Sequence, residues 1–103
     1  MKKIAMISQP MNGLTKEQIL EVKNKAVKNL EKRGYEVINT YFEDFDDSKL
    51  KHKGVFYLAK SIESLSKIDL LYCCKGWENA RGCRFEHDIA VSYGIDVIED
   101  YTE

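Results

Sequence analysis

The chain has 103 residues, of which 44% are hydrophobic, and this length is enough for one domain with a single core. Its 16 Lys and Arg residues are nearly balanced by 17 Asp and Glu residues, which excludes the strong positive field of a general nucleic-acid-binding protein and favours a small ligand or a protein partner. No apolar run approaches the roughly 20 residues that span a bilayer, and no signal-peptide pattern follows Met1, so we expect a cytoplasmic protein that does not enter a membrane.

The first predicted elements are a strand, a loop and a helix. Residues 4–7 form an apolar run that is too short for a helix and is typical of a strand buried on both faces of a sheet. Residues 8–13 contain the only proline and end in a glycine, so they are predicted to form a loop. Thr15 and Gln18 have the spacing of a capping box, which predicts that a helix begins there and ends before Gly34. Its predicted inward stripe is Ile19, Val22, Ala26 and Leu30.

Strands and helices continue to alternate along the rest of the chain. The remaining predicted elements are a strand at 35–38, an exposed loop with at most one helical turn at 39–53, a helix at 55–65, a strand at 68–74, a loop at 75–79, a helix at 80–93 and a strand at 95–98. The order βαβαβαβ predicts an α/β fold, because strands that alternate with helices pair in parallel through right-handed crossovers.

We therefore expect a three-layer sandwich with a four-stranded parallel sheet in the order 2-1-3-4. Residues 1–98 would form this single domain and residues 99–103 a C-terminal tail. Ligands bind such sheets beyond the carboxyl ends of the strands, at the point where the winding reverses. The loops at 8–13 and 75–79 are both expected at that point.

Glu86 is the candidate catalytic residue. It shares one predicted helical face with Gly82, Ile89, Ala90 and Tyr93, which are small or apolar, so its carboxylate is expected to point inward. Burying an unpaired carboxylate costs several kcal/mol, so an inward Glu86 must be paired, hydrogen-bonded or kept for chemistry. The alternative is a surface glutamate, or a buried one whose oxygens are satisfied by loop amides, and periodicity does not separate these interpretations.

Candidate ligand-binding residues lie in the two loops and at the start of the last predicted helix. Gly82 would let a ligand approach the positive end of that helix, or would allow the helix to pack closely on the sheet. Trp77 would stack on a base or cover the edge of the core. Arg81 and Arg84 would offer charge to a phosphate or form a solvated helix surface. The predicted substrate-binding residues are Ser8, Gln9, Pro10, Met11, Asn12, Gly13, Trp77, Glu78, Asn79, Arg81 and Gly82.

No metal or cofactor site is predicted. The acidic run at 43–47 lacks fixed ligand spacing and is interpreted as a solvated loop. His52 and His87 are isolated and are predicted to be surface or partly packed residues rather than catalytic bases. Asp69 opens a strand at the opposite end of the sheet, so its role is interpreted as structural.

The three cysteines are predicted to be reduced thiols. Cys73, Cys74 and Cys83 are odd in number and have no C-x-x-C spacing, so neither a disulfide framework nor a zinc site is indicated. Cys83 lies near a predicted helix start, where a nucleophilic thiol is possible. A small packed residue is the interpretation that we favour.

Two segments carry a family resemblance. They are residues 7–13, ISQPMNG, and residues 76–86, GWENARGCRFE. Together they resemble the nucleoside 2-deoxyribosyltransferase-like family, most closely its small bacterial and phage members. Asp69, Gly94 and Ile95 follow the same pattern in order, so the resemblance covers nearly the whole chain. It implies a flavodoxin-like or Rossmann-like fold.

The resemblance also implies chemistry on the N-glycosidic bond of deoxyribonucleosides or their monophosphates. The family's nucleophilic glutamate corresponds to Glu86, whose carboxylate would attack the anomeric carbon and form a glycosyl-enzyme. The sugar would then pass to a second base in a transferase or to water in a hydrolase. Glu78 is the nearest candidate for protonating the leaving base. Family members commonly self-associate, which implies a homodimer or larger homo-oligomer.

Three positions depart from the family pattern. Met6 stands where characterised enzymes have a tyrosine that orients the glutamate, Gln9 replaces a glycine, and Ala80 replaces a serine. Loss of hydrogen-bond donors around a nucleophile is expected in a member that binds without turnover. The alternative function is therefore a non-catalytic nucleotide-binding or nucleotide-sequestering module on the same fold.

Overall fold

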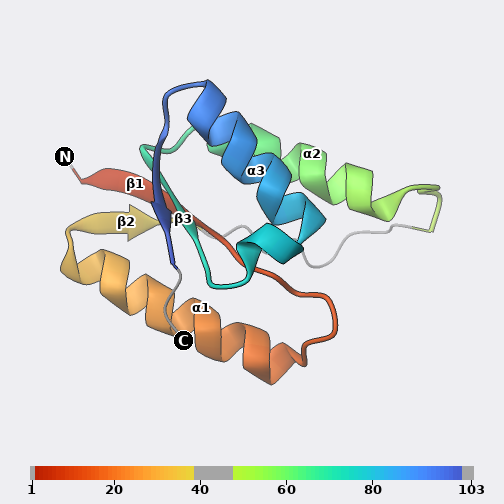
Figure 1. Cartoon of the computed structure of the whole chain (residues 1–103), viewed down its shortest axis with the longest axis horizontal. Helices are drawn as coiled ribbons and strands as arrows, with labels where there is room; N and C mark the ends of the chain where they lie inside the picture. The colour runs from red at the N-terminus through yellow and green to blue at the C-terminus, as the bar shows by residue number, and fades with distance from the viewer. Residues whose placement is uncertain (1, 39–47, 101–103) are drawn as a thin grey trace.

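The computed structural model describes residues 2–38 and 48–100 (Figure 1). Their elements are β1 (Lys3–Ser8), α1 (Lys16–Lys32), β2 (Tyr35–Val37), α2 (Lys53–Leu65), β3 (Leu70–Cys73), the 3-10 helix η1 (Trp77–Asn79), α3 (Arg81–Ser92) and β4 (Asp96–Glu99). The alternation of strands and helices is as predicted, but several boundaries differ by one or two residues: β1 includes Ser8, which was predicted to open the loop, and α2 begins at Lys53 rather than at residue 55. The predicted loop at 75–79 contains η1, and β4 includes Glu99, one residue beyond the predicted domain end. The acidic run at 43–47 lies outside the described residues, as does the end of the predicted tail at 101–103.

The four strands form one parallel sheet in the predicted order β2-β1-β3-β4. The register places Ser8 of β1 beside Cys73 of β3, and Cys73 beside Glu99 of β4. These three residues therefore form the last row of the sheet at the carboxyl ends of its strands. β1 and β3 lie at its centre, where the winding reverses.

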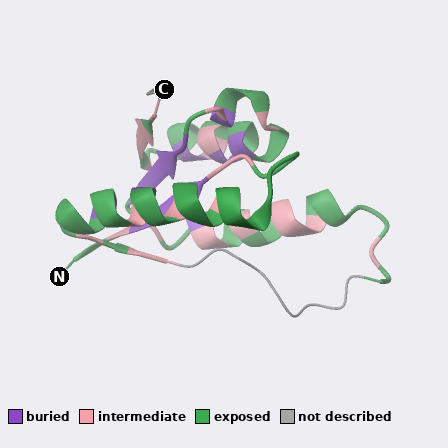
Figure 2. Ribbon diagram, turned by 90° about the horizontal axis from the view of Figure 1, so that it is seen from below, coloured by how far each residue is buried: buried purple, intermediate pink, exposed green. Residues whose placement is uncertain are grey.

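Helices cover both faces of the sheet, with α1 on one face and α2 and α3 on the other (Figure 1). Side chains alternate along each strand, so Ala5 and Ile7 face α1 while Met6 and Ser8 face α2 and α3. Figure 2 shows that the buried residues are concentrated in the strands between the helical layers. The α1 side of the core is made of Ala5, Ile7, Ala26, Leu30, Leu70, Tyr72 and Cys74. The other side is made of Met6, Leu65, Leu71, Cys73, Trp77, Cys83 and Ala90.

Helix α1 begins as predicted, but its apolar stripe is only partly buried. The Thr15 hydroxyl accepts the Gln18 N–H at 3.1 Å, and the Gln18 side chain accepts the Thr15 N–H at 2.9 Å, which completes the capping box. Ala26 and Leu30 are buried, whereas 41% of Val22 is exposed. A helix of 17 residues is about 25 Å long and the strands are shorter, so its N-terminal half extends beyond the sheet.

The structure confirms the structural role that was predicted for Asp69. Its carboxylate accepts the backbone N–H of Ile4 at 2.8 Å. This contact ties the segment before β3 to the start of β1, at the end of the sheet opposite Ser8. Within the described residues, no helix is long and apolar enough to cross a bilayer.

Candidate functional site

A buried hydrogen bond joins β1 to α3 at the carboxyl ends of the central strands. Ser8 Oγ donates to Glu86 Oε1 at 2.9 Å, between residues 78 positions apart in the sequence. Only 8% of Glu86 and 2% of Ser8 is exposed. The inward orientation of Glu86 is thus as predicted, and its partner is a side-chain hydroxyl rather than a loop amide.

Burial dominates the electrostatics of Glu86. It raises the pKa of the carboxyl above its usual value, because an ionised group loses solvation inside the protein. Hydrogen bonds from Ser8 and Ser61 lower the pKa and offset part of this effect. A buried carboxyl held by hydroxyl groups is kept closer to the neutral form than one held by a cation, and perturbed groups of this kind are typical of functional sites.

Ser61 is a site residue that the sequence patterns did not single out. It lies on α2 and brings a second hydroxyl to Glu86 from a third element. A signal was present, because Ser61 shares a helical face with Leu58 and the buried Leu65. A polar residue on an inward face needs a partner, and here that partner is Glu86.

The three cysteines are buried free thiols. Burial is the main cause that raises the pKa of Cys73 and of Cys74 to about 12 and that of Cys83 to about 11. Ser8 lowers the pKa of Cys83 through a hydrogen bond, while the charge of Glu86 raises it. Cys83 is therefore a packed thiol beside the Ser8–Glu86 pair, as favoured from the sequence, and its environment opposes the thiolate that a nucleophile needs.

These thiols are expected to react slowly in the native protein. At pH 8 a disulfide reagent such as Ellman's reagent should modify none of the three rapidly, because they are inaccessible and protonated. All three should react within minutes after denaturation in guanidinium chloride. One rapidly reacting thiol in the folded wild type, lost on Cys83→Ser, would instead make Cys83 a reactive residue.

The two predicted binding loops meet at the carboxyl ends of β1 and β3. Pro10 of the first loop lies against Gly76 of the second, where an added Cβ would be 3.5 Å from Pro10 Cγ. Gly76 has a φ of +87°, a conformation that favours glycine. Gln9 turns away toward α1, because its side-chain amide donates to the carbonyl of Ile19 at 3.0 Å. The rest of the first loop, Met11, Asn12 and Gly13, is exposed.

Trp77 is buried at the edge of the core. Its ring stacks on the imidazole of His87, with centroids 4.1 Å apart and planes 21° from parallel. The indole packs with Met6, Leu71 and Cys83 on the α2 and α3 side of the sheet. Of the two roles predicted for Trp77, the structure shows that it covers the edge of the core. The ring face that lies against His87 is already occupied.

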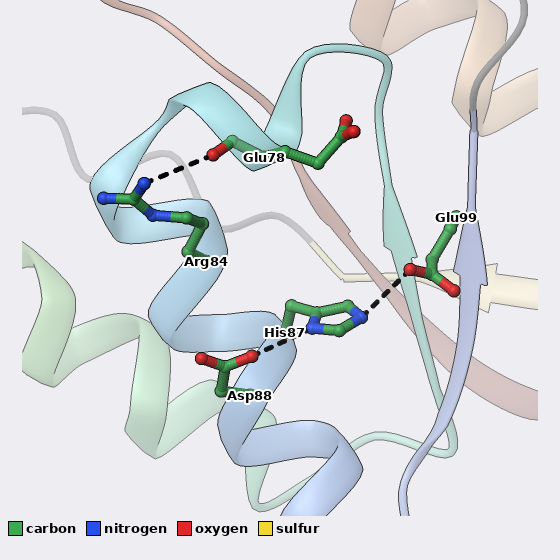
Figure 3. A network of polar contacts seen from close by, with 5 residues as sticks. All are labelled: Glu78, Arg84, His87, Asp88 and Glu99. Atoms are coloured by element: carbon green, nitrogen blue, oxygen red, sulfur yellow. Dashed lines mark hydrogen bonds and ion pairs between the residues drawn. The ribbon is translucent and has the colours of Figure 1, made fainter.

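The start of α3 is open to solvent. Arg81 and Gly82 are exposed, and a Cβ added at Gly82 would meet nothing within 4 Å. Close packing on the sheet is therefore not the reason for a glycine here. Arg84 Nη1 donates to the backbone carbonyl of Glu78 at 3.4 Å, while the Glu78 carboxylate points away from Arg84 (Figure 3).

Gln9, Pro10 and Trp77 pack against α1, Gly76 and the edge of the core, and the other predicted site residues fall into two groups. Ser8 and Glu86 are in direct contact inside the protein. An exposed group surrounds the same edge of the sheet and consists of Met11, Asn12, Gly13, Glu78, Asn79, Arg81 and Gly82. Within the described part of the chain, no three His, Cys, Asp or Glu side chains are grouped as a metal site would require.

Comparison with known families gives one match, which covers residues 3–99. The chain belongs to the family described as domain of unknown function (DUF4406). No curated protein matches it. The matched region runs from the first residue of β1 to the last residue of β4, so it covers the whole sheet and the positions of Ser8 and Glu86 in this chain.

Proposed function

We propose that this chain is a nucleoside 2-deoxyribosyltransferase, or an N-glycosidase of deoxynucleosides or deoxynucleotides, that acts through a covalent glycosyl-Glu86 intermediate. The observation that carries this proposal is the buried Glu86 carboxyl, hydrogen-bonded to Ser8 at the carboxyl ends of β1 and β3. A carboxyl in this position, with a raised pKa, is better explained by chemistry than by stability, because its burial costs free energy.

The reaction follows from the two oxygens of Glu86. Ser8 donates to Oε1, and the carboxylate keeps further lone pairs for attack on the anomeric carbon of a deoxyribose. The C–O bond to Glu86 forms as the C–N bond to the base breaks, and the electron pair of that bond leaves with the base, which takes up a proton. Water or a second base then attacks the same carbon and releases the carboxylate. The exposed Glu78 is our candidate for supplying the proton.

Ser8 supports the catalytic proposal in spite of the departure at Met6. Met6 is buried in the core and has no hydrogen-bond donor for the glutamate. Ser8 lies two residues further along β1, hence on the same face, and does donate to Glu86. A hydroxyl from the same strand therefore stands in for the tyrosine of the family that the sequence resembles.

The decisive experiment is an assay for base release. The protein is incubated with a panel of deoxynucleosides and their monophosphates, with and without a second free base, and products are separated by chromatography. Free base without an acceptor indicates a hydrolase, and a new nucleoside in its presence indicates a transferase. Ligand binding by calorimetry without any product would favour the second candidate.

That second candidate is a non-catalytic nucleotide-binding or nucleotide-sequestering module. It is favoured by the limited access to Glu86, of which 8% is exposed, and by the occupied ring face of Trp77. In this case the exposed loop residues around the carboxyl ends of the strands would bind the nucleotide, and Glu86 would stay buried with Ser8.

We also propose that the chain forms a homodimer or larger homo-oligomer through the helical face formed by α2 and α3. Large apolar side chains are exposed there, with exposed fractions of 66% for Val55, 38% for Ile62 and 47% for Phe85. Light scattering is expected to give a mass of at least twice 11.9 kDa, and Val55→Lys should lower it. Val22→Lys on α1, on the opposite side of the sheet, is the matched control and should leave the mass unchanged. A mass of 11.9 kDa at high concentration would contradict the proposal.

A further inference from the structure

Two consecutive residues of α3 reach strands on opposite sides of β3. β3 lies between β1 and β4 in the sheet. Glu86 contacts Ser8 on β1, whereas His87 Nε2 lies 3.2 Å from Glu99 Oε2 on β4. Successive residues of an α-helix are about 100° apart around its axis. The two contacts therefore fix the rotation of α3 from both sides.

His87 is held by more than one element (Figure 3). Its ring stacks on Trp77 of η1 at 4.1 Å, and its Nδ1 lies 3.1 Å from Asp88 Oδ1. The His87 side chain is 16% exposed, whereas Asp88 is 75% exposed, so solvent screens the Asp88 contact most strongly. The contacts with Trp77 and Glu99 are therefore the ones that tie α3 to its neighbours.

The two contacts of the His87 ring with carboxylates require the ring nitrogens to act as hydrogen-bond donors. Carboxylate oxygens only accept hydrogen bonds, so His87 makes both bonds when each ring nitrogen carries a proton. Rotating α3 so that Glu86 left Ser8 would also break these contacts of His87.

We propose that His87 is a positioning residue for Glu86: Trp77 and Glu99 hold the imidazole, and the imidazole fixes α3 so that the Glu86 carboxyl meets Ser8. The catalytic consequence rests on the proposed function, because it requires Glu86 to be the nucleophile. The structural coupling between His87 and Glu86 through α3 does not depend on that function. Displacing a reacting group by about 1 Å costs on the order of 100-fold in rate, so loosening α3 should reduce kcat.

The test compares His87→Phe with Asp88→Asn. Phenylalanine keeps a ring against Trp77 but removes both carboxylate contacts, whereas Asp88→Asn changes only the exposed partner and is the matched control. Three properties are measured: kcat and KM for base release, the titration of the Glu86 carboxyl by carbon-13 NMR, and the fluorescence of Trp77, the single tryptophan. The emission of an indole depends on the groups that touch its ring, so the fluorescence reports the stacking of His87 on Trp77.

His87→Phe is expected to lower kcat at least about tenfold with KM changed less than about twofold. It should also move the titration of Glu86 toward that of an ordinary carboxyl, because solvent gains access to it. Trp77 emission should change in His87→Phe, and Asp88→Asn should match the wild type in all three properties.

If the His87→Phe variant folds and shows the same Glu86 titration and the same kcat as the wild type, His87 has no positioning role. If the wild type releases no base, the proposed function fails, and the Glu86 titration still decides whether His87 positions it. If His87→Phe does not fold, Glu99→Leu provides the same test from β4, because it removes the oxygen that His87 Nε2 contacts and keeps a side chain of similar size. An unchanged Glu86 titration in Glu99→Leu would then overturn the proposal.

Discussion

Replacing Glu86 with glutamine is expected to lower base release from a deoxynucleoside or its monophosphate by about three orders of magnitude or more. Glutamine keeps the size of the side chain and an oxygen that can accept from Ser8, so the fold should be retained. The neutral amide lacks the charge and the nucleophilic oxygen that the attack on the anomeric carbon requires. The measurement is the initial rate of base release, followed by chromatography.

The control for this variant is Glu63→Gln, which makes the same chemical change at an exposed position of α2. It should release base at the wild-type rate, and circular dichroism should give the same spectrum for both variants. Turnover by Glu86→Gln at the wild-type rate would rule out Glu86 as the nucleophile.

The second expected result is that Glu86→Gln unfolds at a higher temperature than the wild type at neutral pH. The pKa of Glu86 is raised in the folded protein above its unfolded value of about 4.3, so the folded chain binds the proton more tightly between the two values. The free energy of unfolding contributed by Glu86 is therefore fully present below the unfolded pKa and is lost as pH rises through the folded pKa. Each tenfold difference in proton affinity is worth about 1.4 kcal/mol.

The measurement is the difference in the free energy of unfolding between Glu86→Gln and the wild type from pH 4 to pH 8, because other carboxyl groups contribute equally to both proteins. This difference should grow with pH and level off above the folded pKa of Glu86. Glu63→Gln should follow the wild type throughout. A glutamine variant that loses stability relative to the wild type as pH rises would mean that the ionised carboxylate stabilises the fold, and Glu86 would then be structural rather than catalytic.

Local patterns account for most of the fold. Residues 4–7 predicted a buried strand because a sheet covered on both faces needs apolar side chains in both directions. Thr15 and Gln18 marked the start of α1 through contacts within one helical turn. Alternating strands and helices then left parallel pairing as the expected arrangement, and the observed order β2-β1-β3-β4 agrees with it.

The site was less predictable because its contacts join distant segments. The periodicity of apolar residues predicted that Glu86 points inward. Its hydrogen bond to Ser8 depends on the register between β1 and β3, which no local pattern encodes. Ser61 depends in the same way on how α2 packs beside α3. His87 was predicted to be a surface or partly packed residue, which agrees with its burial, but its contacts with Trp77 and Glu99 arise from three separate elements.

The position of Ser8 at the end of β1 also constrains how chain length can vary. Side chains alternate along a strand, so one residue inserted within β1 would direct Ser8 toward α1 and replace it beside Glu86 with its neighbour. An insertion in the exposed tip of the following loop, at residues 11–13, leaves this alternation intact. Related chains of different length can therefore keep this site only where their insertions and deletions fall outside the central strands.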